Sequence, residues 1–140
     1  MAKYIQVYCV GNGNYGASVE DLEGLEALQN AVTHKQDESR ALITITYGTD
    51  EKGRSHAIIC DDEGLLKPKA HDPDLCCKFL GHIMVGHCLV GNPKTDDEGN
   101  ALDIDPSIKP EEILDMIKTD FGLGEQLAYF DMLDRIGNYE

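Results

Sequence analysis

Three glycines near the N-terminus have a spacing that suits phosphate binding. Gly11, Gly13 and Gly16 fit the pattern G-x-G-x-x-G and follow a strand-like run at residues 3–10. In nucleotide-binding folds, such glycines let the N-terminus of the next helix approach a pyrophosphate closely. The spacing therefore raises the hypothesis that this loop binds a small molecule or a nucleotide.

The chemistry around the loop argues against a phosphate. The helix expected to begin at Ser18 carries several carboxylates, and no Lys or Arg occurs between Lys3 and Lys35. Carboxylates repel a nearby phosphate. The next two expected strands form a hairpin, which removes the parallel crossover that the fingerprint requires. We expect an ordinary turn rich in Asn and Gly, and ligand binding at this loop stays an alternative.

A second group of residues has the chemistry of metal ligands. It comprises His71, Cys76, Cys77, His82, His87 and Cys88. Structural zinc sites usually take ligands in pairs two to four residues apart. Here the successive spacings are five, one, five, five and one, and no C-x-x-C occurs. We predict no metal, no cofactor and no catalytic residue, and a zinc-binding regulatory domain that uses His71, Cys76 and His82 is the remaining alternative.

The charge of the chain is the strongest functional signal. There are 26 acidic and 12 basic residues, giving a net charge of −14. From Asp96 to Glu140, 13 acids face only three basic residues, so this part carries 3 − 13 = −10. Such a chain is repelled by nucleic acids and by anionic membranes, and is attracted to basic protein surfaces. The alternative is a surface whose charge serves only solubility.

Carboxylates in the last third are the predicted contact with a basic partner. They comprise Asp96, Asp97 and Glu98 in an expected turn, and Glu111, Glu112 and Asp115 in an expected helix. A second predicted surface, for a partner or a second copy in a homodimer, comprises Tyr129, Met132 and Ile136. These residues belong to a last helix whose apolar positions cover roughly 200° of its circumference, more than a single core stripe.

The elements that would position these residues alternate between strands and helices. Strands are expected at residues 3–10, 41–47, 55–60 and within 79–90. Helices are expected at residues 18–32, from Pro110 onward and at 125–136. The predicted fold is α+β, a mostly antiparallel sheet of four to five strands with one N-terminal and two C-terminal helices. The length of 140 residues suits a single domain, with a β-rich core at 1–92 and a helical pair at 106–137.

Three segments resemble a small phage- and mobile-element-associated family of unknown function. They are LEALQNAV (25–32), AIICDDEGLLK (57–67) and GHIMVGHCLVGN (81–92). In that family an LQ-x-x-V helix precedes an acidic turn with a glycine and a closing strand. The chain departs from the family after Val32, where THKQDESRALITITY replaces the family's G-G-Y-I-E core. The resemblance implies phage origin and transfers no catalytic residue.

Together these observations predict a non-enzymatic, phage-encoded binding protein. It would dock on a basic, nucleic-acid-binding host protein, as an anti-defence inhibitor or nucleic-acid mimic, and would bind neither nucleic acid nor membrane itself. The five cysteines, two of them adjacent, and the lack of a signal peptide predict reduced thiols and a cytoplasmic location. No apolar run approaches the ~20 residues that a membrane span needs.

Overall fold

The computed structural model describes residues 2–11, 14–35, 37–118, 131–132 and 135. The strands in this part are β1 (Ala2–Gly11), β2 (Asn14–Leu22), β3 (Ile43–Thr49), β4 (Ser55–Asp61), β5 (Cys76–Phe79), β6 (His82–Val85), β7 (Cys88–Gly91) and β8 (Ile117–Lys118). The helices are α1 (Gly24–Val32), α2 (Pro110–Asp115) and the 3-10 helices η1 (Gly64–Leu66), η2 (Pro68–His71) and η3 (Pro73–Leu75). None of the described helices has the length and apolar character needed to cross a membrane.

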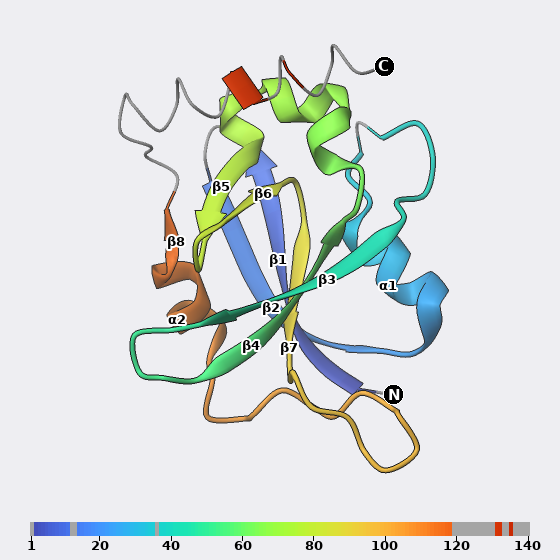
Figure 1. Cartoon of the computed structure of the whole chain (residues 1–140), viewed down its shortest axis with the longest axis vertical. Helices are drawn as coiled ribbons and strands as arrows, with labels where there is room; N and C mark the ends of the chain where they lie inside the picture. The colour runs from blue at the N-terminus through green and yellow to red at the C-terminus, as the bar shows by residue number, and fades with distance from the viewer. Residues whose placement is uncertain (1, 12–13, 36, 119–130, 133–134, 136–140) are drawn as a thin grey trace.

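Two antiparallel sheets form the framework (Figure 1). The larger has five strands in the order β2-β1-β7-β4-β3, and every neighbouring pair is antiparallel. The predicted α+β class and antiparallel sheet are therefore confirmed. A second sheet, in the order β6-β5-β8, was not predicted.

The predicted helix from Ser18 is wrong over its first residues. β2 occupies this region and pairs with β1 from Ala2↔Leu22 to Gly11↔Asn14. The residues that face the core in β2 are Tyr15 and Ala17, two positions apart, and both pack on the main core. A period of two is typical of a strand. The apolar residues from Val19 onward also have helical spacing, but residues 19–22 form part of the strand. The helix α1 begins only at Gly24, which has a φ of +84°.

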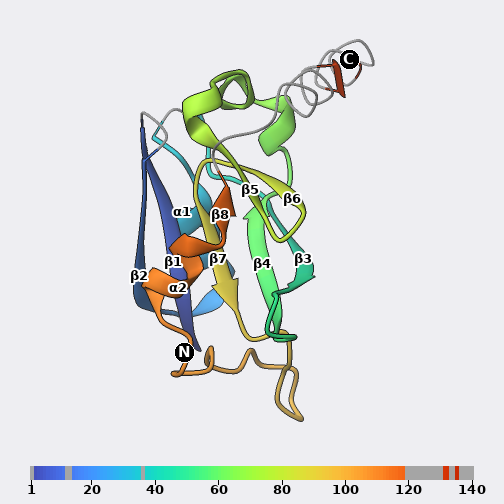
Figure 2. The ribbon, with the colours of Figure 1, turned by 90° about the vertical axis from the view of Figure 1, so that its left-hand side faces the viewer.

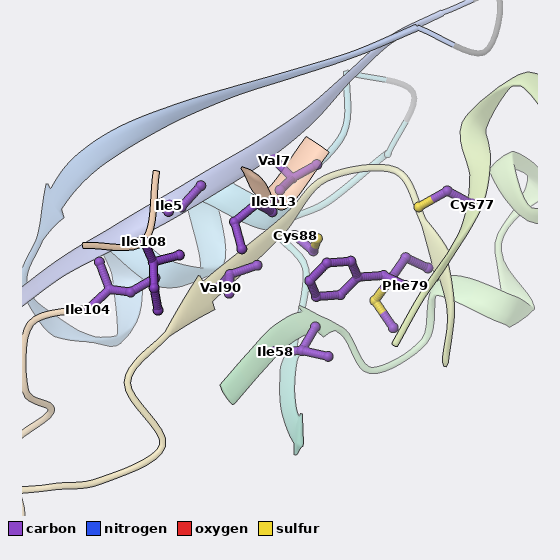
Figure 3. Close-up of a cluster of buried hydrophobic side chains, with 11 residues drawn as sticks. Ile5, Val7, Ile58, Cys77, Phe79, Cys88, Val90, Ile104, Ile108 and Ile113 are labelled. Atoms are coloured by element: carbon purple, nitrogen blue, oxygen red, sulfur yellow. The ribbon is translucent and has the colours of Figure 1, made fainter. Parts of the chain in front are cut away.

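The main core lies between the two sheets (Figure 3). The five-stranded sheet contributes Ile5, Val7, Ile58, Cys88 and Val90, and the second sheet contributes Cys77, Phe79 and Met84. Ile104, Ile108 and Ile113, from α2 and the segment before it, complete the same cluster. The C-terminal part of the described chain therefore shares its core with the N-terminal strands.

The opposite face of the large sheet packs on α1. Ala31 and Val32 of the helix lie in one cluster with Tyr4, Ile59 and Leu89. Figure 1 shows α1 on one side of β1 and β7, and β8 of the second sheet on the other.

The apolar stretch at residues 79–90 is not one strand. It turns at Leu80 and Gly81, which have φ values of +48° and +85°, and again at Gly86, which has a φ of +78°. These left-handed conformations favour glycine. They direct β6 into the second sheet and β7 into the first.

The two C-terminal helices are shown only in part. α2 has six residues, so the helix predicted from Pro110 onward ends at Asp115, and Ile117 and Lys118 form β8 instead. The helix predicted at residues 125–136 falls almost entirely outside the described residues.

Candidate functional site

The connection between β7 and α2 contains the first predicted acidic contact. We call residues 92–109 the acidic segment. It has five acidic residues and two lysines, a charge of 2 − 5 = −3. It contains no helix or strand, but its backbone is tied down by the buried side chains of Ile104 and Ile108, which are 4% and 7% exposed. Figures 1 and 2 show the segment running along one end of the molecule.

Side-chain hydrogen bonds organise the turn at the tip of the acidic segment. The Asp96 carboxylate accepts hydrogen bonds from the backbone N–H groups of Glu98 and Asn100, both at 2.9 Å. The hydrogen bond from the Asn100 backbone is the main reason why the pKa of Asp96 lies below its usual range. Thr95 pairs with Ala101 across the turn. Asp96 therefore shapes the turn, while Asp97 and Glu98 remain exposed.

The rest of the segment is fastened to β1. The backbone N–H of Lys3 donates to a carboxylate oxygen of Asp103 at 2.8 Å, and the N–H of Ile104 donates to the Lys3 carbonyl at 2.9 Å. Asp105 accepts a hydrogen bond from the Ser107 N–H, which keeps the pKa of Asp105 low. The acidic segment thus presents exposed carboxylates from a fixed backbone.

The carboxylates of the second predicted contact, on α2, are of two kinds: two are exposed to solvent, and one is hydrogen-bonded to basic residues. Glu111 and Asp115 are exposed. Glu112 instead accepts hydrogen bonds from Arg54 and from Lys52, the latter at 2.9 Å. These two cations, Arg54 foremost, lower the pKa of Glu112 to about 2. Glu112 therefore fastens α2 to the β3–β4 turn.

The structure separates the two predicted acidic groups. In Figure 1 the tip of the acidic segment and α2 lie at different places on the molecule. They are connected through Ile104, Ile108 and Ile113, which lie in one core cluster. Asp97 and Glu98 are therefore one patch, and Glu111 and Asp115 another.

A buried histidine–aspartate pair supports the β3–β4 turn beside α2, and the sequence did not point to it. His56 Nε2 lies 2.9 Å from Asp50 Oδ2, and Arg54 Nε donates to the same oxygen at 2.8 Å. Burial alone would raise the pKa of Asp50, but hydrogen bonds from His56 and Arg54 outweigh it and hold this pKa well below the usual range. An ionised carboxylate only accepts, so His56 Nε2 carries the hydrogen. The chain Asp50–Arg54–Glu112 is thus a fixed ionic bridge.

A pocket opens next to this bridge. We call it the α2 pocket, and its volume is about 620 Å³. Three segments meet there: the β3–β4 turn, the β5–β6 turn, and α2 with β8. The lining residues are Thr49, Asp50, Glu51, Lys52, Lys78, Leu80, Gly81, Glu112, Asp115, Met116 and Lys118. Two residues of the predicted contact, Glu112 and Asp115, therefore line a cavity.

A second charged cluster has three buried members, Lys69, Asp37 and Asp61. Lys69 Nζ lies 3.0 Å from Asp37 Oδ2 and 3.0 Å from Asp61 Oδ2, and the three side chains are at most 2% exposed. Lys67 joins Asp61 at 2.7 Å. Burial alone would raise the pKa of Asp61, but the hydrogen bonds from Lys67 and Lys69 lower it. The cluster has two positive and two negative charges, and it joins the loop after α1, the end of β4 and η2. The burial of Lys69, Asp37 and Asp61 marks the cluster as a structural feature.

Two histidines pack beside this cluster. The rings of His34 and His87 lie 4.9 Å apart, and His87 Nδ1 accepts the Cys9 N–H at 2.9 Å. Burial, the neighbouring His34 and the Lys69 charge lower the pKa of His87 to about 4. His87 is therefore held neutral in the folded protein at neutral pH.

The structure also places most residues of the two alternative sites, the glycine pattern and the candidate metal ligands. The chain after Gly11 continues into β2, so the glycine pattern has a strand after it, where the fingerprint requires a helix N-terminus. Among the metal-ligand candidates, Cys76 Sγ donates to the carbonyls of Ala70 and Asp72, and His82 Nε2 contacts the Tyr47 carbonyl. Within the described ranges, no three His, Cys, Asp or Glu side chains are arranged to hold a metal.

The predicted oligomer or partner surface is described at one position only. Met132 is half-buried and packs on the cluster of Ala70, Cys76 and Val85. Tyr129 and Ile136 lie outside the described residues.

Comparisons with models of known families, with curated proteins and with solved structures find no match.

Proposed function

We propose that this chain is a non-enzymatic acidic protein that docks on the basic surface of a nucleic-acid-binding protein. The observation that carries the proposal is the acidic segment, whose exposed carboxylates stand on a backbone held by turns and by two buried isoleucines. A surface ordered before binding loses little conformational freedom in the complex. The net charge of −14 adds attraction at long range.

The contact centres on Asp97 and Glu98, with Glu111 and Asp115 on α2 as a second patch. Within the described part of the chain, none of these four carboxylates forms an ion pair with a neighbour, so each can receive a Lys or Arg of the partner. Asp96 and Glu112 contribute indirectly, since they hold the turn and α2 in place.

A nucleic-acid-binding protein is the partner class that best suits this charge. Duplex DNA carries one phosphate charge per ~1.7 Å of its axis, and the grooves that bind it are lined by Lys and Arg. Carboxylates at fixed separations compete for such a groove. The resemblance to a phage-associated family is the basis for proposing a phage origin, and with it inhibition of a host defence protein in the cytoplasm.

Affinity capture with a salt gradient tests this function. The full chain is immobilised, a bacterial lysate is passed over it, and bound proteins are eluted in salt steps and identified by mass spectrometry. Raising the salt from ~0.1 to ~1 M shortens the Debye length from about 10 to about 3 Å. We expect a basic nucleic-acid-binding protein that elutes with salt and is displaced by added duplex DNA. Capture that is insensitive to both salt and DNA would contradict the proposal.

A further inference from the structure

The strand β3 forms one edge of the five-stranded sheet and has none of the features that usually protect an edge. Among the described residues it pairs only with β4, on its inner side (Figure 2). Natural edge strands carry charged residues, proline or a β-bulge, which prevent pairing with another chain. The seven residues of β3, ITITYGT, include no charged residue and no proline. The pairing with β4 continues without a register shift from Ile43 to Thr49, so β3 is an open edge.

The strand at the opposite edge of the sheet, β2, shows the contrast. It carries Glu20 and Asp21, and its pairing with β1 contains a register shift between Cys9 and Gly11. Like charges directly opposite each other destabilise a strand pair, so these carboxylates oppose pairing with a second acidic chain. Of the two edges of this sheet, β3 is therefore the one suited to accept another strand.

The unpaired backbone groups of β3 belong to alternate residues. The Leu42 carbonyl accepts a backbone N–H from the residue after β4 at 2.8 Å, which fixes the phase of the strand. In an antiparallel pair, the N–H and C=O groups of successive residues point to alternate sides. Those of Ile43, Ile45 and Tyr47 therefore point away from β4. In agreement, the Tyr47 carbonyl contacts His82 Nε2 at 3.0 Å on that side.

The side chains along this edge are apolar and exposed. Ile43 packs on the α1 cluster, so Ile45 and Tyr47, two and four residues further, project from the same face of the sheet. Ile45 is 50% exposed and Tyr47 is 58% exposed. A strand added at this edge would cover both side chains.

The sequence of β3 is self-complementary about Ile45. When two copies pair antiparallel with Ile45 opposite Ile45, Ile43 lies opposite Tyr47, and Thr44 lies opposite Thr46. Pairs of a β-branched and an aromatic residue, and Thr–Thr pairs, are favourable cross-strand neighbours. The outward N–H and C=O groups of the two Ile45 residues then bond to each other. The Tyr47 N–H bonds to the Ile43 carbonyl, so the Tyr47 carbonyl keeps its contact within the chain.

We propose that β3 is a homodimer interface, at which the β3 strands of two copies pair antiparallel about Ile45 and join the two sheets into one. A second copy fits this edge because its side chains match those of residues 43–47 in pairs. It also fits by charge, since residues 41–49 carry none, whereas the net charge of −14 opposes contact between copies elsewhere. The interface lies apart from the acidic segment and does not depend on a partner for it.

Sedimentation equilibrium of the full chain tests the dimer. Because an interface of one strand pair is small, we expect a dissociation constant on the order of 10 μM. Raising the salt from ~0.1 to ~1 M should tighten the dimer, since it screens the repulsion between two acidic copies. A complex with a basic partner has the opposite salt dependence, so the two associations are distinguished. A chain that stays monomeric up to about 1 mM at both salt concentrations overturns the inference.

Matched variants locate the interface. Ile45→Lys places two lysines directly opposite each other in the dimer and should weaken it at least tenfold, although it lowers the net negative charge. Val19→Lys makes the same change at a position of β2 that is equally exposed, and should leave the dimer intact. Circular dichroism checks that both variants fold. Equal association of the two variants would place the contact elsewhere and overturn the inference.

Cross-linking tests the register without an added charge. Directly opposite residues have Cα atoms about 5.5 Å apart in a hydrogen-bonded pair, within the range of a disulfide. Ile45→Cys should therefore give a covalent dimer with oxidised glutathione. In Thr44→Cys the two new cysteines are diagonal neighbours about 7–8 Å apart and should not be linked. Equal cross-linking of Ile45→Cys, Thr44→Cys and the unmodified protein would contradict pairing about Ile45.

Discussion

Individual charged residues in this protein differ sharply in what they do, although the sequence shows them as one acidic population. Asp96 organises a turn, Glu112 fastens α2, and Asp61 is buried in an ion cluster, while Asp97 and Glu98 face solvent. Spacing along the chain does not show this difference, because each engaged carboxylate owes its role to a partner brought near by folding.

Lys69 is the residue whose removal should destabilise the protein most among the charged positions. Lys69→Met leaves Asp37 and Asp61 buried with less compensation, and breaking a buried pair costs about 3–5 kcal/mol. Urea unfolding measures the loss. Lys67→Met is the control, because the Lys67 side chain is 21% exposed and its ion pair is partly hydrated. Equal losses from the two variants would contradict the central position assigned to Lys69.

His87 should make the folded protein sensitive to mild acid. Its pKa falls from 6.5 to about 4 on folding, so between these values the unfolded chain binds more protons. Stability is therefore full above pH 6.5 and is lost as the pH falls toward about 4. In the variant His87→Asn, whose amide oxygen can still accept the Cys9 N–H, urea midpoints should depend less on pH over this window. An unchanged slope would show that His87 does not contribute.

At the scale of elements, the acidic segment depends on the isoleucines that anchor it. Ile108→Ala should cost about 2–5 kcal/mol of stability, and Ile108→Val about 0.5–1.5 kcal/mol. Because the alanine variant also loosens the carboxylates, partner binding should weaken more than with valine. Urea unfolding and partner capture measure the two effects. Full partner binding by a destabilised Ile108→Ala protein would mean that the ordered backbone is unimportant.

The sequence predicted the α+β fold class and the large antiparallel sheet. Apolar and polar residues alternate clearly in its strands, and apolar residues recur at regular helical spacing before Val32. Apolar positions such as Ile58 and Val90 carry that information locally. The β2 strand was misread because Val19, Leu22 and Leu25 also fit a helix, and pairing with β1 decides between the two. The second sheet and the α2 pocket could not be predicted, since they depend on contacts between segments distant in the sequence: β8 pairs with β5, and α2 lies beside the β3–β4 turn.

The sequence identified the acidic residues of the predicted contact. It did not show which of them form ion pairs within the protein. Glu112 sits in the same helix as Glu111, yet only Glu112 reaches Arg54. The T-D-E-K-G-R turn carries Lys52 and Arg54, but the sequence does not say which carboxylates these two cations contact.

For the whole molecule, the net charge of −14 should control how fast the protein meets its partner. Long-range attraction raises association rates and is screened by salt, whereas dissociation depends on short-range contacts. With a purified partner, surface plasmon resonance over a salt series should show the association rate falling steeply and the dissociation rate changing little. The reverse pattern would indicate that contacts other than charge govern the encounter.

The most direct test of the account compares two variants of equal charge. Asp97→Asn, Glu98→Gln and Glu111→Gln together change the net charge from −14 to −14 + 3 = −11. Glu38→Gln, Asp62→Asn and Glu63→Gln make the same change at exposed positions in the loop after α1 and the turn after β4. Affinity for the captured partner should fall by at least an order of magnitude in the first variant and by far less in the second. Equal affinities in the two variants would show that only the total charge matters, and that the acidic segment is not a recognition surface.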